Sequence, residues 1–100
     1  MLNITKKQSD GRLTVALEGR IDVATASDLE QEVMSCLDGV TELVFDLEKL
    51  VYISSAGLRV LLATFKQMKV AKGTMVLANV GENFKDVLQN TGLDAVFGVF

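Results

Sequence analysis

The chain has 100 residues, of which 49% are apolar and 23% are charged, and its formal net charge at pH 7 is −3. These values predict one packed domain over residues 1–100, and they argue against disorder and against a nucleic-acid-binding surface. The chain has no histidine, which excludes an imidazole base or metal ligand, and one cysteine, Cys36, cannot build a structural zinc site. We therefore expect no catalytic residue, no metal and no cofactor, and we favour a binding module over an enzyme.

Two further absences concern the cell compartment. No apolar run approaches the roughly 18–20 residues that a membrane span needs, and no long apolar stretch follows the charged N-terminus. We expect neither a membrane span nor a secretory signal. A single cysteine also fits a reducing cytoplasm.

The N-terminal quarter has the pattern of a hairpin. Residues 2–8 are a strand candidate, and residues 9–11 contain the Asp-Gly pair that is typical of a hairpin turn. Apolar side chains then alternate over 13–17, which predicts a half-buried strand. We expect a bend at 19–20 and a short extended piece at 21–23.

A first helix is expected to begin near Thr25. Thr25 and Asp28 have the spacing of a capping box, with Asp in place of the usual Glu or Gln. Gly39 stands where a left-handed C-cap belongs. The apolar residues with helical spacing, which we expect on the buried face, are Ala26, Leu29, Val33 and Leu37.

The rest of the chain alternates between strands and helices. The apolar run 43–45 is typical of a strand covered on both faces, and a second helix spans roughly 55–72. A further strand is expected at 75–78, a third helix at 82–91 and a closing strand at 95–100. Strand-helix-strand units favour parallel neighbours joined by right-handed crossovers. The order predicts a small α/β domain: a mixed β-sheet with an N-terminal hairpin and about three helices packed on it.

The connection before the second helix is unusually apolar. Residues 48–57 should form a short polar loop, yet four apolar residues follow one another there: Leu50, Val51, Tyr52 and Ile53. One interpretation is an extension of the strand or an anchor under the sheet edge. The other is a partly exposed apolar surface that meets a partner. The sequence leaves both open.

Small residues then open the second helix: Ser54, Ser55, Ala56 and Gly57. A helix N-terminus has unpaired N–H groups and the positive end of the dipole, so it suits a serine oxygen or an anion. Either serine could simply be the N-cap, which stabilises a helix by about 1 kcal/mol. A serine nucleophile would need a base, and no histidine exists to supply it. A serine modified by another protein remains open.

Residues 46–58 (DLEKLVYISSAGL) resemble the signature of STAS domains, and residues 19–22 (GRID) followed by Thr25 resemble the family's second marker. The resemblance covers essentially the whole chain and implies a STAS fold. For a stand-alone member it implies an anti-sigma-factor antagonist that acts by partner switching. The unphosphorylated antagonist binds an anti-sigma factor that is also an ATP-dependent serine kinase, and a sigma factor is released. Phosphorylation of one serine breaks the complex, and a serine phosphatase restores the active form.

By the same resemblance, Ser55 is the phosphoacceptor. The residues expected to contact the partner are Asp22, Thr25, Tyr52, Ser54, Ala56, Gly57, Leu58 and Arg59. Two positions depart from the family pattern: Ser54 stands where many members have aspartate, and Arg59 where several have a second glycine. The sequence leaves open whether Ser54 is an alternative acceptor, and Arg59 is expected to enlarge and charge the docking surface.

Two other functions are compatible with the sequence. One is a scaffold STAS subunit of a signalling or lipid-transport complex, in which the serine is a cap and contact and is never phosphorylated. The other is an enzyme or small-ligand carrier, for example a nucleotide-binding protein, although no phosphate-binding loop is present.

Overall fold

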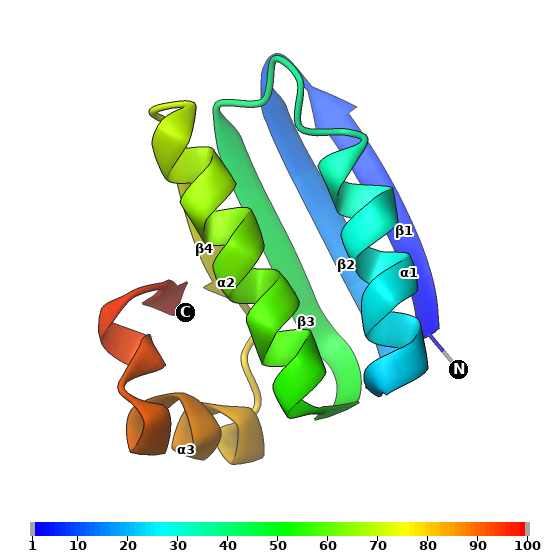
Figure 1. Cartoon of the computed structure of the whole chain (residues 1–100), viewed down its shortest axis with the longest axis vertical. Coiled ribbons are helices and arrows are strands. Elements are labelled where there is room, and N and C mark those ends of the chain that lie inside the picture. Colours follow the sequence, from blue (N-terminus) through cyan, green and yellow to red (C-terminus); the bar gives the residue numbers. More distant parts are fainter. Residues whose placement is uncertain (1, 100) are drawn as a thin grey trace.

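The computed structural model describes residues 2–99 and forms the mixed α/β domain that the sequence predicts (Figure 1). Its five-stranded sheet has the strands in chain order: β1 (Leu2–Ser9), β2 (Arg12–Ile21), β3 (Glu42–Ile53), β4 (Thr74–Ala78) and β5 (Gly98–Val99). The helices are α1 (Val23–Met34), α2 (Ser55–Val70), α3 (Glu82–Thr91) and a short 3₁₀ helix (Leu93–Ala95). The hairpin partners β1 and β2 are antiparallel, and every later pair is parallel.

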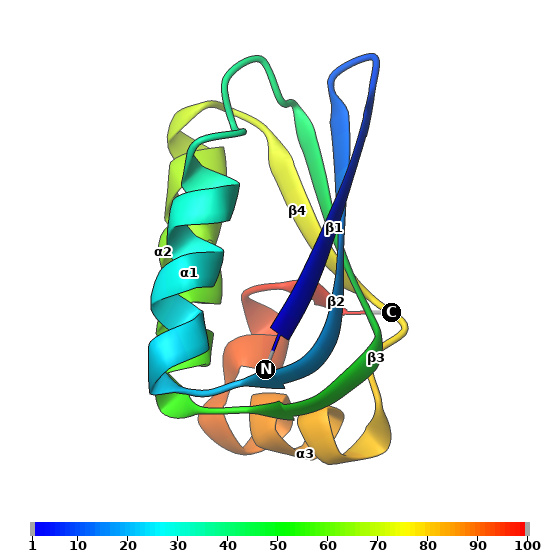
Figure 2. The same cartoon turned by 90° about the vertical axis from the view of Figure 1, so that its right-hand side faces the viewer.

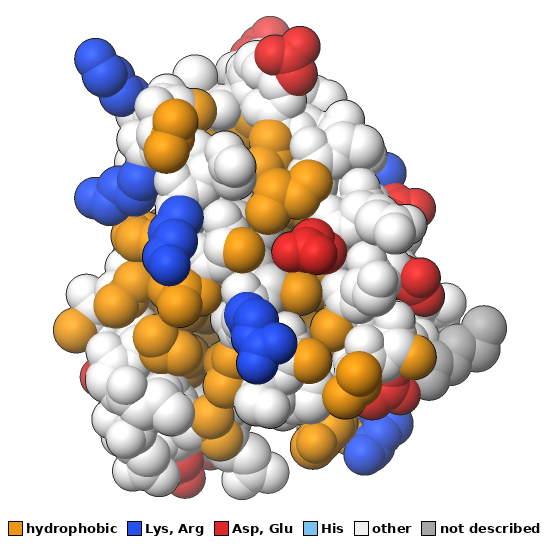
Figure 3. All heavy atoms as spheres, viewed as in Figure 1, with side chains coloured by type: hydrophobic (Ala, Val, Ile, Leu, Met, Phe, Trp, Pro, Cys, Tyr) orange, Lys and Arg blue, Asp and Glu red, His pale blue; other side chains and the backbone are white. Residues whose placement is uncertain are grey.

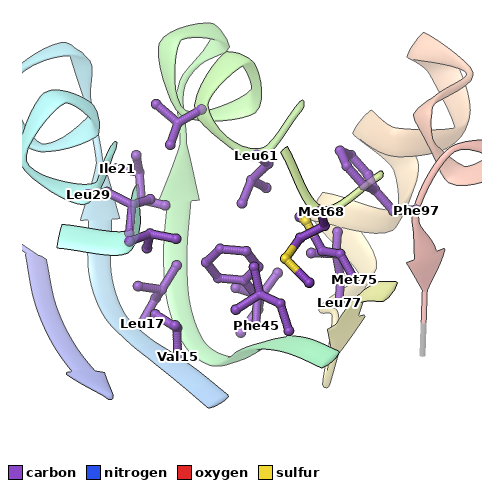
Figure 4. Close-up of a cluster of buried hydrophobic side chains, with 14 of the residues drawn as sticks. Val15, Leu17, Ile21, Leu29, Phe45, Leu61, Met68, Met75, Leu77 and Phe97 are labelled. Carbon is purple, nitrogen blue, oxygen red and sulfur yellow. The ribbon is translucent and has the colours of Figure 1, made fainter. Parts of the chain in front are cut away.

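The helices α1 and α2 lie on the same face of the sheet (Figure 2). Their buried side chains meet the alternate side chains of β2, β3 and β4 that point to this face, and Phe45 is fully buried in this layer (Figure 4). The expected inward face of α1 is confirmed for Ala26, Leu29 and Val33, which are all buried. The parallel strands β2, β3 and β4 end at the edge of the sheet where α1 and α2 begin and α3 lies (Figure 1). Functional side chains gather at such an edge in open α/β sheets.

The predicted strand at 43–45 is correct, and all three of its residues are buried. The helices cover only the Leu43 and Phe45 side of β3. Val44 points to the opposite face, where it lies between Thr14 of β2 and Val76 of β4 in the register. Flanking strands therefore bury Val44, and no second layer of helices is needed.

The expected limits of the first helix were wrong at both ends. The helix α1 begins at Val23 with Asp22 as its N-cap, two residues before the predicted start, and it ends at Met34 with Ser35 as its C-cap. Gly39 has the expected positive φ of 78°, but it lies in the turn beyond the helix. Leu37 is likewise outside the helix and packs against the edge of the core.

The other boundaries are closer to prediction. The helix α2 ends at Val70, two residues early, and α3 matches its predicted range, with Gly92 as the left-handed C-cap at a φ of 76°. The closing strand is shorter than expected. A 3₁₀ turn occupies Leu93–Ala95, and only Gly98 and Val99 pair with β4. The prediction for Phe100 lies outside the described residues.

Candidate functional site

The apolar stretch before α2 is the last half of β3 and not a loop. β3 continues to Ile53, so the strand-extension interpretation is correct. The stretch is nevertheless partly exposed: Val51 is 75% exposed and Tyr52 is 44% exposed, while Leu50 and Ile53 are half-buried. An extended strand thus carries apolar side chains out to the surface beside the start of α2.

Two bulges direct these side chains. β3 gains one extra residue against β2 between Asp46 and Lys49, and a second between Leu50 and Tyr52. A bulge bends a strand and changes the direction in which the following side chains point. Gly19, at a φ of 113°, lies on β2 opposite the second bulge, and its backbone conformation favours glycine. The expected bend at 19–20 is therefore an irregularity within a continuous strand.

The ends of β2 and β3 are tied together directly below α2. The backbone N–H of Ser54 donates to the carbonyl oxygen of Ile21 over 2.8 Å. Gly57 is buried against the same two strands, and a Cβ atom there would lie 2.6 Å from Ile53 Cγ1 and 2.7 Å from Ile21 Cγ2. Glycine at position 57 therefore permits the close approach of α2 that places its first turn at the sheet edge.

The two adjacent serines have different roles in the structure. Ser54 is the N-cap of α2, and its Oγ accepts a hydrogen bond from the backbone N–H of Gly57 over 3.2 Å. Ser55 is the first residue of the helix and is exposed. Within residues 2–99 the Ser55 hydroxyl has no hydrogen-bond partner. The Ser55 hydroxyl is thus free to meet an incoming reagent, whereas Ser54 is engaged.

A capping box joins Asp22 and Thr25 at the start of α1. The carboxylate Oδ1 of Asp22 accepts from the backbone N–H of Thr25 over 2.9 Å, and the Asp22 N–H donates to the Thr25 hydroxyl oxygen over 2.8 Å. Hydrogen bonds from Thr25, first its backbone N–H and then its hydroxyl, hold the pKa of Asp22 below its ordinary value. The predicted Thr25–Asp28 box was wrong because Thr25 is the third residue of the helix and the partner of the cap.

The remaining residues expected to contact a partner are distributed around the first turn of α2. Ala56 and Leu58 are half-buried and pack against the core, so only part of each faces solvent. Arg59 is exposed. The structure therefore brings this group together at one end of the sheet, with Asp22 and Thr25 on the neighbouring α1.

Sequence reasoning missed Arg20. Its guanidinium carbon lies 4.6 Å from the centroid of the Tyr52 ring, a cation–π contact between facing positions of β2 and β3. The pairing depends on both bulges, because without them Arg20 would face a different residue of β3. No local signal in the sequence reveals such a register.

An apolar groove lies beside this group, between the end of β3 and the start of α3. Its volume is about 410 Å³. β3 contributes Leu50, Tyr52 and Ile53 to its walls, and α3 contributes Phe84 and Val87. The face shown in Figure 3 also carries orange apolar side chains between α2 and α3.

Residues 2–99 lack the features of two other kinds of site. No three acidic or cysteine side chains there lie together in a way that could hold a metal ion. None of the helices in that range is both long and apolar enough to cross a lipid bilayer.

The chain belongs to the STAS domain family, whose model matches residues 3–100. BtrV of Bordetella bronchiseptica, named as a candidate anti-sigma factor antagonist, is 36% identical over 99 residues, which cover 98% of this chain and 85% of BtrV. The crystal structure of an anti-sigma factor antagonist from Mycobacterium paratuberculosis is 29% identical, has a TM-score of 0.88 and covers 100% of this chain and 86% of its own. The family resemblance predicted from residues 19–22 and 46–58 is confirmed.

A more distant solved structure shares the fold. SpoIIAA, a Bacillus cell fate determinant solved in its phosphorylated form, has a TM-score of 0.79 and covers 98% of this chain and 91% of its own. At 17% identity this likeness concerns the fold alone.

Proposed function

We propose that this protein is an anti-sigma factor antagonist that acts by partner switching. The unmodified chain binds an anti-sigma factor with ATP-dependent serine kinase activity, and a sigma factor is released. The kinase phosphorylates Ser55, the complex dissociates, and a serine phosphatase regenerates the active form. The single observation that supports this cycle best is the exposed, unengaged hydroxyl of Ser55 in the first turn of α2, shortly after the exposed Val51 and Tyr52 at the end of β3.

The chemistry of the modification assigns the catalytic work to the partner. The Ser55 oxygen attacks the γ-phosphorus of ATP, the bond from that phosphorus to the β,γ-bridging oxygen breaks, and ADP leaves. The hydroxyl proton passes to a base that the kinase supplies, as a kinase catalytic carboxylate does for the hydroxyl of its substrate. The antagonist is thus a substrate and a binding module, not an enzyme. Its place is the cytoplasm, where the anti-sigma factor and ATP are found.

Phosphorylation can switch binding without unfolding the antagonist. The modification adds a charge of about −1.5 to −2 at neutral pH. At the start of α2 the helix dipole stabilises that charge by roughly 0.3–1 kcal/mol, so the fold tolerates it. An interface that brings the same charge against a carboxylate loses on the order of several kcal/mol, and each 1.4 kcal/mol weakens binding about tenfold. The switch therefore acts on the docked surface and not on the monomer.

A pull-down with two variants tests the proposal. We expect Ser55→Ala to capture the anti-sigma factor from a lysate of the source cells and to resist phosphorylation when ATP is added. We expect Ser55→Asp to stay folded, with a melting temperature near that of the wild type, and to lose the same protein. Equal capture by both folded variants would contradict the switch. Capture by both, with no phosphate gained by the wild type in the presence of its bound partner, would favour the scaffold function.

A further inference from the structure

Ser55 and Arg59 lie on the same exposed strip of α2. They are four residues apart, and both are exposed. Side chains with this spacing are neighbours on a helix, with Cβ atoms about 5–6 Å apart. Helical side chains also lean toward the N-terminus, which directs a side chain at position 59 toward the turn that contains Ser55. A phosphate attached to the Ser55 oxygen would lie within reach of the guanidinium.

Among residues 2–99 of the unmodified chain, Arg59 has no anionic partner. The ion pairs within residues 2–99 join Lys6 to Glu32 over 2.7 Å and Arg12 to Glu42 over 3.3 Å. The first turn of α2 contains no acidic residue. A cation close to a helix N-terminus also meets the positive end of the dipole, which is unfavourable. An anion placed in the first turn would therefore give Arg59 a partner that it lacks among residues 2–99.

Of the charged groups near the start of α2, Arg59 is the one that is available to pair with a phosphate on Ser55. Arg20, the other arginine at this end of the sheet, is stacked over the ring of Tyr52. The hydrogen bond from the Ser54 N–H to the Ile21 carbonyl brings the segment that ends in Asp22 alongside the start of α2. The Asp22 carboxylate, which is ionised at neutral pH, repels a phosphate from that side.

We propose that Arg59 is the intramolecular partner of phosphorylated Ser55. This inference rests on the proposed function, because it takes Ser55 as the phosphoacceptor. The planar guanidinium offers two parallel N–H donors to phosphate oxygens, which makes the pair stronger than an ordinary surface ion pair. In the unmodified protein the Arg59 guanidinium is available to an acidic group of the docked partner. Phosphorylation therefore adds an anion to the docking surface, and the same phosphate occupies the Arg59 guanidinium that would otherwise be available to the partner.

The test measures the phosphate directly and needs no kinase. Phosphoserine is installed at position 55 by genetic code expansion, and its second pKa is determined by ³¹P NMR titration in three proteins: wild type, Arg59→Gln and the matched control Arg20→Gln. An ion pair of this kind should lower the phosphate pKa in the wild type by about 0.5 unit relative to Arg59→Gln. Arg20→Gln should titrate like the wild type. In 1 M NaCl, where the screening length is about 3 Å, the difference between wild type and Arg59→Gln should shrink.

Two results would overturn the proposal: the same phosphate pKa in wild type and Arg59→Gln, or a shift in Arg20→Gln alone. A melting curve of each variant before phosphoserine is introduced confirms that it is folded, since both replaced side chains are exposed. Lysine at position 59 keeps the charge without the planar fork, and we expect Arg59→Lys to give an intermediate pKa. If the phosphate pKa does not depend on Arg59, the partner-switching cycle still stands. If the pull-down fails, the result of the phosphate titration is unaffected.

Discussion

The different roles of Ser54 and Ser55 lead to opposite expectations for two alanine substitutions. Ser54→Ala removes the oxygen that accepts from the Gly57 N–H, and the loss of an N-cap of this kind costs about 1 kcal/mol. For a domain of about 100 residues this lowers the melting temperature by roughly 4–8 °C. Ser55→Ala removes an exposed hydroxyl that caps nothing, so its stability should stay within about 0.5 kcal/mol of the wild type.

Thermal unfolding followed by circular dichroism, with urea titration as a second measure, separates the two variants. Ser54→Asp is the matched control, because aspartate caps a helix as well as serine and its charge suits the N-terminus. We expect Ser54→Asp to melt within about 2 °C of the wild type. Loss of stability in Ser55→Ala with none in Ser54→Ala would refute the assignment of the cap, and with it the argument that the Ser55 hydroxyl is free.

Three further substitutions test how the site is held in place, each by urea denaturation. Gly57→Ala forces a Cβ atom against Ile53 and Ile21. We expect it to lower the free energy of unfolding by roughly 1–2 kcal/mol, because overpacking outweighs the better helix propensity of alanine. Unchanged stability would show that α2 does not approach the strands so closely. Asp22→Asn removes a carboxylate whose pKa is lowered by folding. The stabilisation that this carboxylate provides is present above pH about 3.9 and is lost as the pH falls through the folded pKa. If the difference in unfolding free energy between wild type and Asp22→Asn does not shrink on acidification, the reasoning is contradicted. Phe45→Ala should cost about 3–5 kcal/mol, and a loss below 1 kcal/mol would place Phe45 outside the core.

The elements of the fold were predictable where a local pattern determines them. The buried strip of α1 follows from helical spacing, and the end of α3 follows from Gly92, whose left-handed conformation glycine adopts without strain. The start of α1 was missed because Thr25 has the chemistry of an N-cap. Asp22 has the same chemistry three residues earlier, and the cap formed there. Local propensity alone does not distinguish two such candidates.

The residues proposed for the site, except Arg20, could be located in the sequence, but their geometry could not. The motif around Ser54 and Ser55 could be found in the sequence, yet either serine could cap the helix. Only the hydrogen bond to Gly57 separates the two roles. The contact between Arg20 and Tyr52 depends on bulges in a parallel pairing of distant segments. Such a register follows from the packing of the whole sheet, which no short window of sequence contains.

The affinity of the captured anti-sigma factor for the antagonist, measured with and without phosphoserine at position 55, tests the central claim most directly. Isothermal titration of the purified partner should give at least about 100-fold weaker binding to the phosphorylated protein, which corresponds to roughly 2.7 kcal/mol. The melting temperatures of the two forms should differ little, because the helix dipole of α2 tolerates the charge. Equal affinity of the partner for both forms would contradict the account.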